Sequence, residues 1–321
     1  MDKTVPGVNC VENQDTESPI DDLTEAGFKV SRIPDQFLAD LVHVKISKAG
    51  NQGIGSSLSA TIALAKAYHE YHERTVLKTL KLSSSSGLAA HYDEQLARES
   101  SQDELIERDV FLTSWFSQTT PYWLDDAQLS NHSRLAGDLI GRLRSKGIVF
   151  RVGVVGSCSG YQVSVGIVEG KDFEKPFGMI LATAAGKDFN QTCHKIAMDL
   201  SWGRTLSILI LDSSKRLCIK RSEVKKPADH LFYYLDPDSC SDFEWYLKSN
   251  SNVPVFAPFD ISTKTIDSTD PSPLWTPSVS QASSTECQSY FAGLPGSRLN
   301  AARFIANNLK PVLVDSIHPL G

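Results

Sequence analysis

Two short acidic motifs hold the residue types in this sequence that are best suited to chemistry. Both have the spacing Glu-x-x-Glu-Arg, and their members are Glu70, Glu73 and Arg74, then Glu104, Glu107 and Arg108. Residues three and four positions apart share one face of a helix, so each motif would present two carboxylates and a guanidinium together. Paired carboxylates suit a hard cation such as Mg²⁺, and the arginines could hold phosphate oxygens or orient the glutamates.

A solvated, salt-bridged helix surface is the favoured interpretation of either motif taken alone. A shared functional role is favoured because each motif follows a Gly/Ser stretch and a helical pattern, and a looser third copy ends in the single acid Asp199. Apolar neighbours such as Leu64, Leu105 and Ile106 indicate partly buried helices. A carboxylate on such a helix needs a partner, and a metal ion is one kind of partner.

The histidines of the first motif invite a zinc interpretation. In His69-Glu70-x-His72-Glu73 the two histidines are three positions apart. The zinc-protease pattern requires histidines four positions apart on one helix face, so that motif is excluded and a surface histidine pair is predicted instead. A metal-dependent hydrolase would rest on this cluster alone.

The elements that must position the motifs follow from the periodicity of apolar residues. The pattern predicts a strand over 42–47, a glycine-rich turn over 50–57, a helix over 58–80, a break of small residues over 81–90 and a helix over 93–116. Asp93 would cap the second helix. In the predicted helix over 58–80, the small side chains of Ala63 and Ala67 would let a bulky ligand approach the helix backbone.

Strands dominate the rest of the predicted structure. We expect a helix over 133–145, then strands over 148–155 and 161–169 around a turn. A strand over 177–183 should lead into a helix over 188–203, and 206–211 with 217–220 should form a hairpin. The rest is predicted to be a Ser/Thr/Pro-rich loop over 262–286 and a helix over 297–310. The fold class is therefore α/β in the mixed α+β sense, with mixed or antiparallel sheets packed against acid-bearing helices. Residues 1–25 are interpreted as a flexible leader, and 26–321 as a single domain.

The composition of the chain argues against several classes of protein. The chain has 321 residues, 41% of them hydrophobic and 22% charged, which is ordinary globular usage. A net charge of −6 argues against nucleic acid as a partner. No apolar run approaches the ~20 residues of a membrane span, and the acidic first residues are unlike a secretory signal. We therefore expect a cytoplasmic protein.

At the two motifs the sequence resembles the YcaO family. The stretch GIGSSLSATIALAKAYHEYHER at 53–74 is similar to that family's glycine-rich turn and acidic helix, and SSSGLAAHYDEQLARESSQDELIERDVFLTSW at 84–115 resembles its next turn and helix. The stretch 182–204 is similar to a later helix of the family, with Asp199 where glutamate is usual. His318-Pro319 resembles its proline-containing C-terminus.

The resemblance implies a YcaO-like fold and an ATP- and Mg²⁺-dependent enzyme that acts on backbone amides of a ribosomally made peptide. In the azoline-forming members, a Cys, Ser or Thr side chain attacks the preceding carbonyl, ATP phosphorylates the amide oxygen, and phosphate leaves. The product is a thiazoline or an oxazoline. Other members make thioamides or amidines with a different nucleophile.

Roles for individual residues follow from the resemblance alone. The residues implied to hold metal are Glu70, Glu73, Glu104, Glu107 and Asp199. Those implied to bind the nucleotide are Arg74, Arg108, Ser57 and Gly87. The turns could offer backbone N–H groups near helix N-termini. No catalytic residue is assigned.

The implied partners are a precursor peptide, an E1-like leader-recognition protein, a dehydrogenase and further copies in an oligomer, with no nucleic acid and no membrane. One alternative is a non-catalytic, degenerate YcaO-like scaffold subunit. Only twelve residues, 75–86, separate Arg74 from Gly87, and Leu96 and Ser100 stand where the family tends to place amide or acidic ligands. A thioamide-forming YcaO enzyme is a further alternative.

Overall fold

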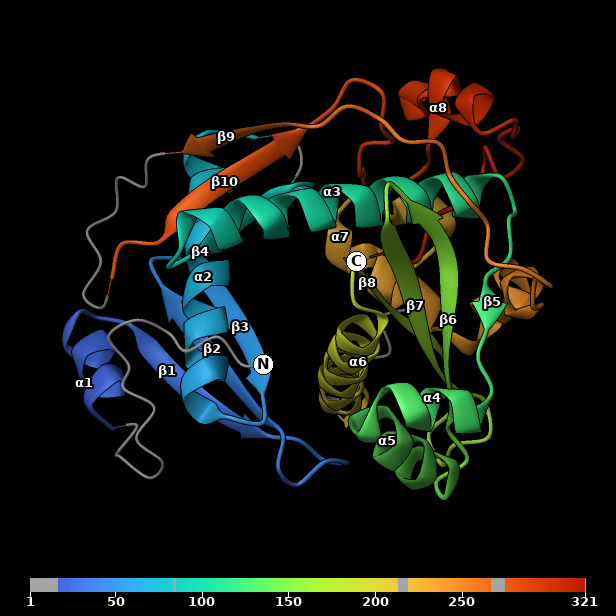
Figure 1. Ribbon diagram of the computed structural model, residues 1–321. Coiled ribbons are helices and arrows are strands. Elements are labelled where there is room, and N and C mark those ends of the chain that lie inside the picture. Colours follow the sequence, from blue (N-terminus) through green and yellow to red (C-terminus); the bar gives the residue numbers. More distant parts are fainter. Residues whose placement is uncertain (1–16, 83–84, 213–218, 267–274, 321) are drawn as a thin grey trace. The chain divides into compact units, whose positions relative to one another are not determined.

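The computed structural model describes residues 17–82, 85–212, 219–266 and 275–320 (Figure 1). The chain divides into two compact units. Unit 1 comprises Met1–Pro34, Asp40–Ser101 and Thr263–Ala282, and unit 2 comprises Asp35–Ala39, Gln102–Ser262 and Ser283–Gly321. Within the described ranges, no helix has the length and apolar character needed to cross a bilayer. The single domain over 26–321 stays a prediction.

Unit 1 is built on an antiparallel sheet of three strands in the order β1-β2-β3. The strands are β1 (Lys29–Pro34), β2 (Val42–Lys48) and β3 (Asn51–Ser57), and helix α1 (Glu17–Glu25) packs against β1. The predicted glycine-rich turn is wrong, because the turn is only Ala49-Gly50, both with positive φ. A two-residue turn of this kind matches the twist of a hairpin. Part of the predicted leader, Glu17–Glu25, is helical.

Helix α2 (Ala60–Thr79) lies on β2 and β3 (Figure 1). The glycines of β3 explain the contact: a Cβ on Gly53 would stand 2.0 Å from the carbonyl oxygen of Ala67, and one on Gly55 2.0 Å from that of Ala63. Both alanines are fully buried. The expectation that they open the helix to a ligand is therefore wrong, since the space above them is filled by β3.

A second sheet of unit 1 has the order β4-β10-β9. Its strands are β4 (Leu88–His91), β9 (Ser262–Ile266) and β10 (Ser278–Ser283). Two of them lie in the segment 262–286 that the composition indicated as a loop, and residues 267–274 of that segment are outside the described ranges. Val279, Ser280 and Ala282 of β10 are buried, so this strand is part of the core of unit 1.

Helix α3 (Glu94–Phe116) carries the second acidic motif. The Asp93 carboxylate accepts the backbone N–H of Leu96 at 2.9 Å, so the predicted cap is confirmed. The boundary between the units falls inside this helix, after Ser101. From Ile106 onward its apolar side chains are buried in the core of unit 2, which explains why it lacks a single apolar stripe.

Unit 2 contains an antiparallel sheet in the order β5-β6-β7-β8. Its elements up to α6 are β5 (Tyr122–Trp123), α4 (Asp126–His132), α5 (Arg134–Arg144), β6 (Val149–Cys158), β7 (Tyr161–Gly170), β8 (Phe177–Gly186) and α6 (Phe189–Asp212). Helix α6 packs on β7 and β8, and α4 and α5 pack beside it (Figure 1). The predicted mixed fold of antiparallel sheets and acid-bearing helices is confirmed.

The predictions for the C-terminal third are the least accurate. The short elements there are η1 (Arg221–Glu223), α7 (Pro227–Leu235), η2 (Pro237–Asp242), η3 (Glu244–Leu247), η4 (Gly296–Arg298) and α8 (Ala301–Ala306). Residues 206–211 belong to α6 and form no hairpin, while 217–218 lie outside the described residues. The predicted helix over 297–310 is only α8, because Asn300 caps its start and Asn308 has a positive φ.

Candidate functional site

The carboxylates of the first motif bond to backbone groups of unit 1. Glu70 accepts the N–H of Ile54 in β3 and pairs with Arg74 at 2.5 Å. Glu73 accepts the N–H of Ala90 in β4 at 2.8 Å. The two glutamates therefore tie α2 to one strand of each sheet in unit 1. The side chains of Glu70 and Arg74 remain 29% and 44% exposed, so they are also accessible from solvent.

The other two predicted nucleotide-binding residues of unit 1 have local structural partners. The Ser57 hydroxyl, at the end of β3, accepts the N–H of Ser59 at 3.2 Å. Gly87 has a φ of +71°, and its carbonyl accepts the N–H of Ala282 at 2.7 Å. Only glycine fits there, because a Cβ would stand 2.4 Å from the Ala282 carbonyl oxygen. Their role toward a nucleotide stays a prediction.

The predicted surface histidine pair is instead buried. His69 is 8% exposed and His72 is 1% exposed. The His69 ring lies 4.9 Å from that of His91 and 6.0 Å from that of Trp275. Burial, followed by the charges of His91 and His72, lowers the pKa of His69 to about 3. This face of α2 packs into unit 1, which the histidines alone did not indicate.

The second motif lies in a group of alternating charges in unit 2. The Glu107 side chain is 5% exposed and accepts the Thr183 hydroxyl of β8 at 2.5 Å. The ammonium of Lys195, on α6, is 3.8 Å from Glu107 Oε2, and the guanidinium of Arg108 is 3.7 Å from Glu107 Oε1. A buried carboxylate thus holds two cations from two different helices.

Three further contacts complete this group. Arg108 Nε is 3.7 Å from Glu104 Oε1, and the guanidinium lies 5.7 Å from the ring centre of Tyr290. Asp199, one turn after Lys195 on α6, acts electrostatically on the Lys195 ammonium. We call these residues, Glu104, Glu107, Arg108, Lys195 and Asp199, the α3–α6 charge cluster.

The charge cluster keeps Glu107 and Lys195 ionised. Burial raises the pKa of Glu107, but Lys195 and Arg108, with bonds from Thr183 and Ala185, outweigh it and hold the pKa below its ordinary value. Loss of solvent lowers the pKa of Lys195, and the neighbouring acids raise it above its ordinary value. The result is two permanent cations beside three acids, a combination that can bind both phosphate oxygens and a hard cation.

Sequence reasoning placed four of these five residues at a functional site and missed Lys195. A signal existed, because Lys195 stands four positions before Asp199 and so shares its helix face. Thr183 and Tyr290 carried no such signal, since sheet and chain topology bring them to α3. The described residues include no group of three or more His, Cys, Asp or Glu side chains arranged to hold a metal ion.

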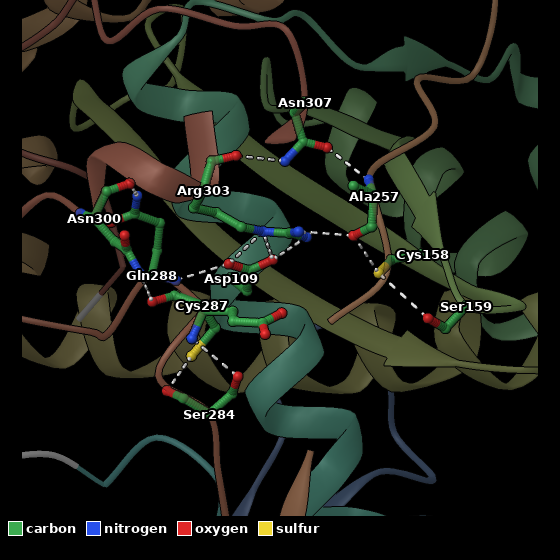
Figure 2. Close-up of polar contacts among 11 residues, drawn as sticks. Asp109, Cys158, Ser159, Ala257, Ser284, Cys287, Gln288, Asn300, Arg303 and Asn307 are labelled. Carbon is green, nitrogen blue, oxygen red and sulfur yellow. Dashed lines mark hydrogen bonds and ion pairs between the residues drawn. The ribbon is translucent and has the colours of Figure 1, made fainter. Parts of the chain in front are cut away.

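Behind the cluster, Asp109 anchors the C-terminal segment to α3. Figure 2 shows the Arg303 guanidinium over the Asp109 carboxylate, with Nη2–Oδ2 at 2.6 Å and both side chains at most 1% exposed. Asp109 also accepts the N–H of Gln288 at 2.8 Å, and Arg303 donates to the carbonyl of Ala257 at 2.7 Å. This network fixes the backbone near Tyr290, the ring that Arg108 covers.

Residues 58–195 match the family model of the YcaO cyclodehydratases, described as ATP- and Mg²⁺-binding. This segment is somewhat less than half of the chain, and it includes both acidic motifs and ends at Lys195. No curated protein sequence matches the chain.

Three solved structures share the fold at low identity. YcaO from Methanopyrus kandleri bound with AMPPCP and Mg²⁺ has a TM-score of 0.57 and 12% identity, over 92% of this chain and 93% of that one. The E. coli microcin synthetase McbBCD complex gives 0.54 and 10%, over 80% and 88%. A heterocyclase in complex with substrate and cofactor gives 0.59 and 13%, over 81% and 49%. Residues 58–195 are therefore similar to the YcaO domain, and the likenesses to the solved structures show that the chain has the YcaO fold.

Proposed function

We propose that this protein is an ATP- and Mg²⁺-dependent cyclodehydratase that modifies backbone amides of a ribosomally made precursor peptide. The observation that carries the proposal is the α3–α6 charge cluster, in which the buried Glu107 holds Lys195 and Arg108 beside further acids. Phosphoryl transfer asks mainly for positioning and for neutralisation of charge, and this cluster supplies both.

ATP, when bound, would supply the phosphoryl group that activates the amide oxygen once a Cys, Ser or Thr side chain has attacked the carbonyl. The oxygen would then leave as inorganic phosphate, with ADP as the other product, and the peptide would show a net loss of one water. Toward that nucleotide, Arg108 and Lys195 bind phosphate oxygens. Glu104 and Asp199 offer carboxylate oxygens to Mg²⁺. In unit 1, Glu70 and Glu73 are further candidates for the metal, and Arg74 for phosphate. Convergence of both motifs on one nucleotide stays a prediction.

We also propose that the protein acts within a complex. The microcin synthetase with the same fold is a complex, and one of its structures has pro-MccB17 bound. For this chain, the corresponding partners would be the precursor peptide, an E1-like protein that recognises its leader, and a dehydrogenase that oxidises the azoline.

The test is a reconstituted reaction with a co-expressed precursor peptide, read by mass spectrometry. Cyclodehydration removes one water from the peptide for each ring. Glu70→Ala and Glu107→Ala should each abolish the loss, whereas Glu99→Ala, at an exposed position of α3, should retain it. Unchanged heterocyclisation in both site variants would refute the assignment. A gain of mass would instead identify the thioamide alternative, in which sulfur replaces the amide oxygen.

One observation favours the second candidate, a non-catalytic YcaO-like scaffold. Glu70 and Glu73 accept backbone N–H groups of β3 and β4, which gives both acids a role in the fold of unit 1. A scaffold should show no change in melting temperature when ATP and Mg²⁺ are added. A ligand that binds only the folded state stabilises it, so an increase of several degrees would contradict the scaffold.

A further inference from the structure

Lys195 places a positive charge beside Glu107, an acid that the sequence predicted to bind a metal ion. Its ammonium is 3.8 Å from Glu107 Oε2, and its side chain is 54% exposed while that of Glu107 is 5% exposed. The lysine side chain is therefore open to solvent, while the carboxylate that its ammonium faces is buried.

Both carboxylate oxygens of Glu107 have partners. Oε1 accepts the Thr183 hydroxyl at 2.5 Å and faces Arg108 at 3.7 Å, and the N–H of Ala185 also bonds to the carboxylate. Oε2 faces Lys195. A divalent ion at Glu107 would have to displace one of these partners from an almost inaccessible side chain, which makes the residue a poor metal ligand and a good anchor for cations.

We propose that Lys195 is a built-in cation of the α3–α6 charge cluster: its ammonium supplies the positive charge that a divalent ion would otherwise supply beside Glu107, and it binds a phosphate group of the nucleotide. This inference rests on the proposed function and assigns Lys195 a role in it. A lysine ammonium is a point charge with several donors on a flexible stem, and such a group can follow a phosphate without exact geometry.

The net formal charge of the α3–α6 charge cluster depends on Lys195, and this charge affects metal binding. Glu104, Glu107 and Asp199 are three negative charges, and Arg108 and Lys195 are two positive charges, so the cluster carries −1. Without Lys195 it would carry −2. The attraction between the cluster and a divalent ion increases with the net negative charge of the cluster. Removal of Lys195 should therefore raise the affinity of the cluster for a divalent ion.

The first experiment uses Mn²⁺ alone as the probe, with the full chain and no nucleotide, and measures binding by electron paramagnetic resonance. Lys195→Gln should bind Mn²⁺ at least about tenfold more tightly than the native protein. Lys195→Arg keeps the charge and should behave as the native protein does. Lys187→Gln removes the same charge from an exposed position of unit 2 and should also leave Mn²⁺ binding unchanged. Equal affinity of native protein and Lys195→Gln would overturn the inference.

The second experiment measures ATP binding by calorimetry, with Mg²⁺ and with EDTA. In the native protein the dissociation constant should rise by less than about tenfold when Mg²⁺ is removed, and in Lys195→Gln by at least about tenfold more than in the native protein. An equal dependence on Mg²⁺ in both proteins would contradict a role of Lys195 in phosphate binding. Absence of ATP binding by the native protein in both conditions would contradict the proposed function, and the Mn²⁺ comparison would then decide the charge assignment alone.

Discussion

Glu107 and Asp109 are two buried acids on one helix with different partners. Glu107 holds cations that reach solvent, and Asp109 holds Arg303, which is 1% exposed. Residues two apart point to different sides of a helix, so one turn of α3 serves both the charge cluster and the attachment of the C-terminal segment. The sequence shows two acids two positions apart, and their surroundings give them different roles.

Asp109→Asn should lower the free energy of unfolding by about 3–5 kcal/mol, because it leaves the Arg303 charge buried without its partner. Urea unfolding followed by circular dichroism measures the change. Glu99→Gln, at an exposed position of the same helix, should stay within about 0.5 kcal/mol of the native protein. A loss below about 1 kcal/mol for Asp109→Asn would show that water or another side chain compensates Arg303.

Two buried histidines give stability a dependence on pH. Burial lowers the pKa of His230 and lowers that of His318 well below its ordinary value of 6.5. The unfolded chain therefore takes up protons that the folded chain refuses. The free energy of unfolding should decrease below about pH 6.5, by up to about 1.4 kcal/mol per pH unit for each histidine.

Urea unfolding at a series of pH values between 7.5 and 5 tests this expectation. His318→Gln retains a donor for the carbonyl of Phe291, which His318 Nε2 reaches at 2.7 Å in the native protein. The variant should have a shallower slope of unfolding free energy against pH. An identical slope would show that His318 does not titrate on unfolding.

At the scale of the elements, close contact between α2 and β3 is the main feature of unit 1. It depends on the glycines of β3 facing the alanines of α2. The sequence predicts α2 and β2 correctly but takes β3 for a turn, because glycines that allow close packing look the same as glycines that allow a turn. Only the pairing of β3 with β2 separates the two interpretations.

Gly55→Ala should destabilise the protein by about 1–3 kcal/mol, because the new methyl group would overlap the backbone of α2. Gly141→Ala is the matched control, since this glycine lies in α5 and its Cβ would meet nothing within 4 Å. The control should stabilise the protein by about 0.5–1 kcal/mol through helix propensity. Thermal unfolding of both variants measures the difference. An equal effect of the two substitutions would contradict the packing assignment.

For the whole molecule, the C-terminal tail closes the core of unit 2. Ile317 and Leu320 are 1% and 3% exposed and belong to the same apolar cluster as Phe116 at the end of α3. Phe116 and the tail are far apart in sequence, so bringing them together costs chain entropy that the buried apolar contacts must offset. The tail is therefore part of the core and not an appendage.

Ile317→Ala should lower the free energy of unfolding by about 2–5 kcal/mol through lost burial and a cavity. Val312→Ala, five residues earlier at a side chain 54% exposed, should change it by less than about 0.5 kcal/mol. Chemical denaturation distinguishes the two. A small effect at Ile317 would mean that the tail does not contribute to the stable core.

The local sequence determined the helices that carry the motifs, the β6–β7 hairpin and the fold class. These features depend on the 3.6-residue and two-residue periods of apolar residues, which can be recognised from residues close together in the chain. The local sequence also placed Glu104, Glu107, Arg108 and Asp199 on the right helices. Only tertiary structure decided that His69 and His72 are buried, that 262–286 contains two strands, and that Lys195 joins Glu107. Each of these depends on contacts between residues far apart in the chain, and burial and charge pairing arise only when those contacts form.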